Sequence, residues 1–115
     1  MMICTAEGNK HFSVHQVVIA DHYFSRLRGL MFRKSLSNDE GLLLKKCGSI
    51  HCCFMRFPID VIYLNDNMEV LKVETVRPWR VGSLVKGARH VLEVAEGVAS
   101  SVQQGDVIMF KEVDA

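Results

Sequence analysis

Short apolar runs separated by turn residues are the feature that most constrains the fold of this chain. Stretches rich in Val, Ile, Leu and aromatic residues recur along the sequence, and Gly, Asn, Asp or Pro interrupts them about every eight to twelve residues. This spacing is typical of strands joined by tight turns. We therefore expect a mainly β fold.

Several of these runs have a pattern that indicates their environment. Met1–Thr5 and Phe12–Ile19 flank Gly8-Asn9 and should form a hairpin. Gly41–Leu44 is apolar throughout, which predicts a strand buried on both faces. Met68–Val76 alternates, so Lys72 and Glu74 should share the exposed side of a half-buried antiparallel strand. The remaining expected elements are strands at 59–64, 88–95 and 107–111, a strand through Phe54, a turn at 65–67 and one helical turn within 98–104.

One segment has a different period. Phe24, Leu27, Leu30 and Met31 lie three and four residues apart, and Asp21 or Ser25 can cap a helix N-terminus. We expect a helix of about three turns that ends near Phe32.

Together these elements predict the fold class. We expect an antiparallel sandwich or barrel of about seven or eight short strands with one principal α-helix packed against it. A parallel sheet is not expected, because the sequence lacks the repeated helical crossovers that such a sheet requires. The 115 residues fit one domain, 1–115, with a core that needs no disulfide or metal.

Charge and hydropathy narrow the partners. The formal charge of +1 does not favour a nucleic-acid partner. No run of about 18 apolar residues and no signal-peptide pattern occurs, so we expect a cytoplasmic protein with no membrane partner and with its four cysteines reduced. Residues 75–92 contain four basic side chains and no acid, which is typical either of a solvated face or of a small-anion site.

Ser49–Asp60 is where a functional site is expected. An imidazole, two thiols, a guanidinium and a carboxylate lie in an otherwise apolar stretch, and such groups are costly to bury without partners. Neighbouring strand residues point to opposite faces, so Cys52 and Cys53 cannot readily bind one ion. We therefore predict no metal and no cofactor. A thiol nucleophile beside His51 or His90 is disfavoured too, because apolar surroundings raise a thiol pKa. We interpret the cysteines as small core residues.

The remaining polar groups can form a cluster. The predicted ligand contacts are Arg28, His51, Arg56, Asp60, Trp79 and Arg80. In one interpretation this is a structural ion pair, in which the Asp after the proline bend holds an arginine. In the other it is the polar floor of a pocket for a small polar or anionic ligand. The sequence leaves both open, and it leaves the oligomeric state open.

The motifs occur in an order that is similar to that of a known family. They are Arg28–Arg33, Gly41–Leu43, Ser49–Val61, Pro78–Arg80, Val91–Val94 with Gly97, and Gly105-Asp106. From about residue 17 to 110 the chain resembles the bacterial and archaeal family called domain of unknown function 192, in the subgroup with Ser-Ile-His and Pro-Trp-Arg motifs. The resemblance implies a mainly β fold and no established activity.

Three functions follow from these residues. The leading hypothesis is a ligand-binding domain with a cleft around residues 49–60. The first alternative is an enzyme, a hydrolase or lyase of unknown reaction, with His51 as general base and Asp60 as the second catalytic candidate. The second alternative is a protein-interaction module that offers a sheet edge or a basic loop to a partner.

Overall fold

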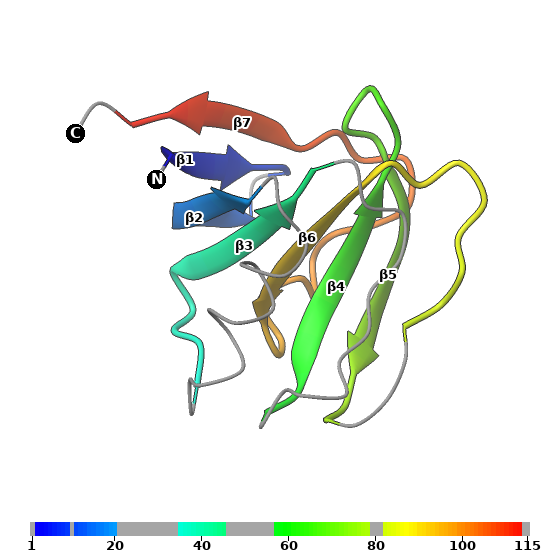
Figure 1. Cartoon of the computed structure of the whole chain (residues 1–115), viewed down its shortest axis with the longest axis horizontal. Coiled ribbons are helices and arrows are strands. Elements are labelled where there is room, and N and C mark those ends of the chain that lie inside the picture. The colour runs from blue at the N-terminus through cyan, green and yellow to red at the C-terminus, as the bar shows by residue number, and fades with distance from the viewer. Residues whose placement is uncertain (1, 10, 21–34, 46–56, 79–81, 114–115) are drawn as a thin grey trace.

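Seven strands make up the regular structure of the described part of the chain. The computed structural model describes residues 2–9, 11–20, 35–45, 57–78 and 82–113. The strands are β1 (Met2–Glu7), β2 (Ser13–Ala20), β3 (Glu40–Leu44), β4 (Ile59–Leu64), β5 (Val70–Val76), β6 (His90–Ala95) and β7 (Met109–Glu112) (Figure 1). They form one sheet in the order β5-β4-β6-β3-β2-β1-β7. The predicted mainly β class is confirmed.

The sheet is mixed rather than purely antiparallel. β2 pairs with β3 in parallel, from Gln16 opposite Glu40 to Ala20 opposite Leu44. β3 and β4 also run in the same direction, because β6 lies between them and is antiparallel to both. The expectation of an antiparallel sheet was wrong here, since residues 21–39 and 45–58 are each longer than the dozen or so residues that a parallel crossover needs.

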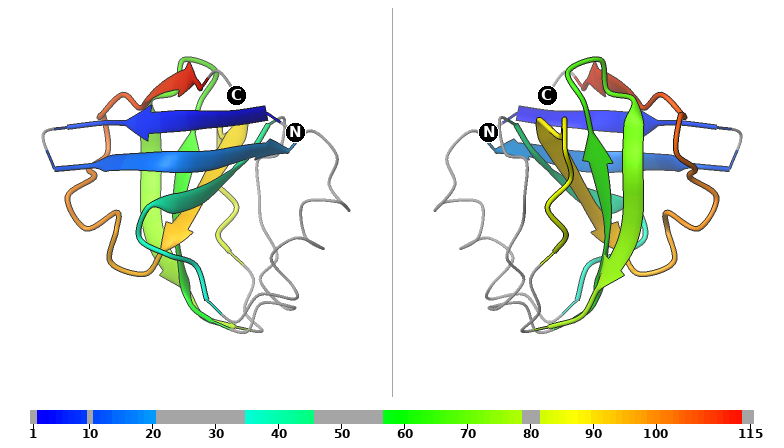
Figure 2. Two further views of the ribbon diagram at one scale, coloured as in Figure 1. Left: turned by 90° about the vertical axis from the view of Figure 1, so that its left-hand side faces the viewer. Right: turned by 90° about the vertical axis from the view of Figure 1, so that its right-hand side faces the viewer.

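The sheet is strongly curled, but it does not close into a barrel. Figure 2 shows β1 and β2 crossing β4 and β5 at a steep angle. At one corner the chain before β7 reaches the start of β5, where the Val70 N–H donates to the Asp106 carbonyl at 2.7 Å. The Ile108 N–H donates to the Met68 carbonyl at 2.9 Å. The strand order ends at β5 on one side and at β7 on the other, so the sheet has two edges. The structure is therefore an open, curled sheet instead of the predicted sandwich or barrel.

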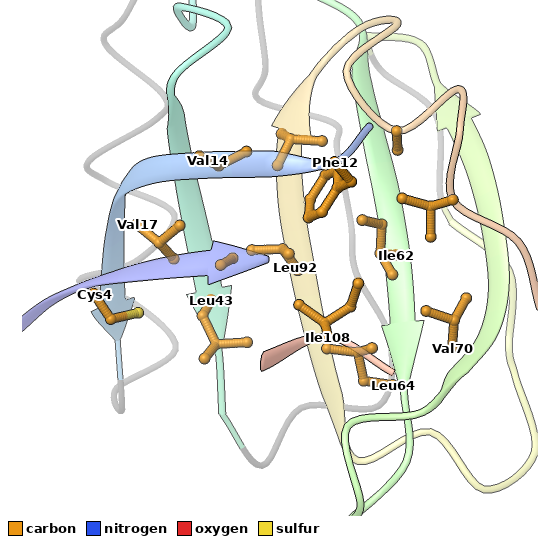
Figure 3. Packing of buried hydrophobic residues seen from close by; sticks show 14 residues of the cluster. Cys4, Phe12, Val14, Val17, Leu43, Ile62, Leu64, Val70, Leu92 and Ile108 are labelled. Carbon is orange, nitrogen blue, oxygen red and sulfur yellow. The ribbon is translucent and has the colours of Figure 1, made fainter. Parts of the chain in front are cut away.

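The first core fills the inside of the curl. Phe12, Leu43, Ile62, Leu92 and Ile108 are at most 1% exposed and pack there against one another (Figure 3). Cys4 belongs to this core at 1% exposure, which confirms the interpretation of that cysteine as a small core residue. Burial raises the pKa of its thiol.

The second core covers the opposite face of β3, β4 and β6. Its buried members are Leu36, Leu42, Leu44, Ile59, Val61, Tyr63, Val76, Val91 and Ala95. Leu43 lies in the first core while Leu42 and Leu44 lie in the second, so the apolar run of β3 is buried on both faces as predicted. Leu36 and Phe57 place the described ends of both crossover connections on this second face.

The predicted turns are present. The Gly8 N–H donates to the Phe12 carbonyl at 3.1 Å in the β1–β2 hairpin. The Asn65 carboxamide oxygen accepts from the backbone of Asn67 and Glu69 between β4 and β5. Residues 97–102 form successive turns rather than the helical turn expected there.

The predicted helix at 21–32 and the predicted strand through Phe54 lie outside the described residues. Within the described ranges, no helix is long and apolar enough to cross a membrane.

Candidate functional site

Asp60 is the predicted site residue whose surroundings the structure describes. It is the second residue of β4 and only 4% exposed. Its carboxylate accepts hydrogen bonds from the Thr75 hydroxyl at 2.7 Å and from the N–H groups of Gly97 and Ala99 at 2.9 and 3.1 Å. These donors offset the loss of hydration that burial imposes on the carboxylate.

The orientation of Asp60 follows from strand alternation. It shares a strand face with Ile62 and Leu64, which belong to the first core, and Ala99 belongs to the same core. Asp60 therefore ties the edge strand β5 and the turns after β6 to the start of β4.

The other predicted contacts lie outside the described residues. These are Arg28, His51, Arg56, Trp79 and Arg80, and Cys47, Cys52 and Cys53 lie outside as well. Their convergence on one cavity stays a prediction. Among the residues that are described, no three His, Cys, Asp or Glu side chains are arranged to hold a metal ion.

The sheet register nevertheless shows where these segments join the fold. Ile59 is paired with Val76 on one side and with Ala95 on the other. The Ser49–Pro58 stretch leads directly into Ile59, and the stretch that contains Trp79 and Arg80 begins directly after Val76. Two motifs that are separate in the sequence therefore join the sheet at the same end. We call this place, defined by Ile59, Val76 and Ala95, the motif end of the sheet.

Two glutamates outside the predicted set of site residues lie on the second face. Glu93 is paired with Leu42 of β3 on one side and with Val61 of β4 on the other, and Val61 is paired in turn with Glu74 of β5. Side chains of directly paired residues point to the same face of a sheet, so all four lie on one side. Glu93 is 1% exposed on the interior strand β6, and it has an interaction partner in the structure. A buried carboxylate in the second core is costly unless positive or donor groups satisfy it.

Glu74 belongs to a hydrogen-bond network at the edge strand β5. Its carboxylate accepts from the Tyr63 hydroxyl at 2.6 Å, from the Ser83 N–H at 2.9 Å and from the Ser83 hydroxyl at 3.0 Å. The Lys72 ammonium donates to the Ser83 Oγ at 2.8 Å. Burial alone would raise the pKa of Glu74, but these hydrogen bonds and the nearby Lys72 outweigh it and lower the pKa.

The sequence contained a signal for one of these residues. Glu93 interrupts the apolar run Val91–Ala95, which is the same kind of signal that selected Asp60. Glu74 was predicted to lie on the exposed side of its strand with Lys72, and alternation alone could not show its bonds to Tyr63 and Ser83.

Several other titratable side chains of the described residues are exposed. His11 and His15 are exposed, and the His15 Nδ1 lies 2.7 Å from an Asp39 carboxylate oxygen. His22 lies outside the described residues. In the basic stretch, Arg77, Lys86 and Arg89 are exposed.

Comparisons with known proteins place the chain among relatives. A model of the DUF192 family, described as Uncharacterized ACR, matches residues 3–110. A UPF0127 protein from Pyrococcus furiosus is 38% identical over 96 residues, which cover 79% of this chain and 83% of that protein. A second, from Pyrococcus horikoshii, is 37% identical over 91 residues, which cover 76% of this chain and 79% of that protein.

Solved structures share the fold. A protein of unknown function from Novosphingobium aromaticivorans matches with a TM-score of 0.77 at 20% identity, over 93% of this chain and 83% of that chain. A chain from Sinorhizobium meliloti, named as a candidate transcription regulator, matches with a TM-score of 0.76 at 18% identity, over 95% of this chain and 92% of that chain. At such identities the likeness concerns the fold alone. The family match and the sequence relatives together show that this chain belongs to the uncharacterised DUF192 family.

Proposed function

We propose that this domain binds a small polar or anionic ligand at the motif end of the sheet. The observation that carries the proposal is the pairing of Ile59 with both Val76 and Ala95. This pairing brings together the end of the Ser49–Asp60 motif, where it joins the sheet, and the start of the Pro-Trp-Arg segment. The proposed ligand contacts are Arg28, His51, Arg56, Trp79 and Arg80.

Glu93 supports the proposal through its charge and burial. A carboxylate that is 1% exposed on the second face needs donors, and an arginine can satisfy it with two parallel N–H bonds. A guanidinium held in this way keeps a fixed orientation, and its remaining N–H groups can bind an anion. We propose that Glu93 orients one of the proposed arginines.

Asp60 has a different proposed role. A carboxylate accepts about four hydrogen bonds, and Thr75, Gly97 and Ala99 already supply three. We propose that Asp60 anchors the start of β4, and that it supports the site without being the main ligand contact. The enzyme alternative needs a carboxylate beside His51, and these bonds to Asp60 do not favour it.

The interaction-module alternative has one observation in its favour. Leu84 is 90% exposed in the connection between β5 and β6, and it lies in the same connection as Trp79. If this alternative is correct, Leu84→Ser abolishes binding to a protein partner and leaves small-ligand binding unchanged.

The chain offers a direct probe for the ligand proposal. Trp79 is its single tryptophan, so tryptophan fluorescence reports on one proposed contact. A library of small carboxylates and phosphates is titrated into the protein, the emission is followed, and each hit is verified by calorimetry. Arg56→Ala and Arg80→Ala should each weaken the binding of a verified hit by at least about tenfold, as expected for the loss of one charge-assisted hydrogen bond.

Arg89→Ala is the matched control. It removes the same charge from a side chain that is 62% exposed, and the Arg89 N–H bonds to Leu64 at the opposite end of β4 from Ile59. The control should bind each hit as the wild-type protein does. Absence of any hit at millimolar ligand, or equal weakening by Arg89→Ala, contradicts the proposed site.

A further inference from the structure

We infer that Glu74 is a positioning residue for the proposed ligand site. It holds the connection from β5 to β6 against the sheet without being a ligand contact itself. The inference rests on the proposed function where it concerns ligand affinity. Its structural part rests on the described hydrogen bonds of Glu74.

The geometry of the connection carries the argument. The connection leaves β5 after Val76, which is paired with Ile59 at the motif end. It returns to β5 at Ser83, whose N–H and hydroxyl both donate to the carboxylate of Glu74. Glu74 and Val76 are two residues apart on one strand, so the ends of the 77–82 stretch are fixed to neighbouring positions. Trp79 and Arg80 belong to this stretch by sequence.

The carboxylate that closes the stretch is itself held from both sides. Tyr63 of β4 is fully buried, and its hydroxyl donates to Glu74 at 2.6 Å. The Lys72 ammonium of β5 donates to the Ser83 Oγ at 2.8 Å. The Ser83 hydroxyl therefore accepts a hydrogen bond from a charged group while it donates one to Glu74. Four hydrogen bonds within this network therefore fix one backbone position, Ser83, to two strands. We call Tyr63, Lys72, Glu74 and Ser83 the Glu74 clamp.

A purely structural role predicts a different outcome from a positioning role. Glu74 is half-buried on an edge strand, where a loop that covers the edge protects the sheet from pairing with other chains. If the clamp only covers the edge, its removal changes stability and leaves ligand affinity unchanged. If it positions the connection, its removal weakens ligand binding in protein that is still folded.

Two substitutions separate charge from geometry. Glu74→Ala removes the carboxylate that accepts three of the four hydrogen bonds of the clamp. Glu74→Gln keeps the shape, because its amide oxygen can accept from Tyr63 and from the Ser83 N–H while its amide nitrogen donates to the Ser83 Oγ. Glu69→Ala is the control, since it removes the same charge from an exposed residue just before β5.

Amide hydrogen exchange tests the clamp without any ligand. Glu74→Ala should speed exchange of the Ser83 amide by at least about tenfold relative to amides of β6, and Glu74→Gln should restore most of the protection. Glu69→Ala should leave the exchange unchanged. Exchange in Glu74→Ala within twofold of wild type overturns the inference.

Ligand affinity tests the positioning role. For a ligand that the wild-type protein binds, Glu74→Ala should raise Kd by about tenfold at a urea concentration where all variants are folded, while Glu74→Gln stays within threefold. An unchanged Kd together with faster Ser83 exchange overturns the positioning role and leaves the clamp structural. If the wild-type protein binds no ligand, the proposed function fails, and the exchange result still decides whether the clamp holds Ser83.

Discussion

Replacing Asp60 by Ala should destabilise the domain more than most single changes, because its carboxylate accepts three hydrogen bonds from two separate segments, β5 and the turns after β6. The change leaves the N–H of Ala99 without its acceptor, and Ala99 is 1% exposed. Gly97 and Thr75 are exposed residues, so their donors can turn to water at lower cost. Hydrogen bonds to a charged group contribute about 1.5–3 kcal/mol when buried and less when water can replace them. We expect a loss of about 3–4 kcal/mol in the free energy of unfolding.

Urea denaturation followed by circular dichroism measures this loss. Domains of this size typically have a free energy of unfolding of about 5–15 kcal/mol, which falls by about 1–3 kcal/mol per molar urea. With a dependence of about 2 kcal/mol per molar, the midpoint should fall by about 1.5–2 M. Asp60→Asn should cost less, about 1–2 kcal/mol, because its amide oxygen can still accept from Gly97 and Ala99 while its amide nitrogen donates to Thr75.

Asp66→Ala serves as the control because it removes an aspartate that is 72% exposed and pairs only weakly with Arg89 at 3.5 Å. It should change the stability by less than about 1 kcal/mol. A loss below about 1 kcal/mol for Asp60→Ala refutes the anchoring role, since the buried Ala99 N–H alone should exceed that value. If the same variant lost ligand binding while remaining stable, Asp60 would be a ligand contact.

Three further predictions follow from the described residues. Burial lowers the pKa of His90 from its usual 6.5 more than Asp66 raises it, so the unfolded chain binds the proton more readily than the folded protein does. The stability that neutral His90 contributes is therefore complete above pH 6.5 and is lost as the pH falls below that value. Urea midpoints measured from pH 5 to 8 should fall less steeply towards acid pH in His90→Gln than in the wild-type protein. The pKa of Glu74 in the folded protein lies below its usual 4.5, so the stability that its carboxylate contributes is present above pH 4.5 and is lost as the pH falls through the lower folded-state value. Glu74→Gln should therefore make the free energy of unfolding less dependent on pH below 4.5. The same pH dependence in Glu74→Gln and in the wild-type protein contradicts this prediction. Gly41→Ala should lower the free energy of unfolding by about 1–3 kcal/mol in thermal or urea unfolding. Its new methyl carbon would lie 3.2 Å from the Glu93 carbonyl oxygen and 3.3 Å from a Val17 methyl group. A neutral or stabilising result would show that β3 can shift away from β6.

Strand positions were the most predictable part of this protein. The alternation at Met68–Val76, the all-apolar run at Gly41–Leu44 and the turn residues at Asn65–Asn67 each specify a local structure through side-chain periodicity or backbone preference. Family membership was predictable too, because ordered motifs survive in the sequence. These features depend on neighbours that are close along the chain.

The tertiary structure decided which strands pair and what each polar group bonds. Periodicity carries no information on partner or direction, so the parallel pairing of β2 with β3 was not visible in the sequence. Asp60 is recognisable in the sequence as a polar residue in an apolar run, but two of its three bonds reach Gly97 and Ala99, more than thirty residues away. Glu74 looked like an exposed strand residue until the fold brought Ser83 to it. Hydrogen bonds between distant segments exist only once the chain has folded, and they determine whether a charged side chain is an anchor, a clamp or a solvated surface group.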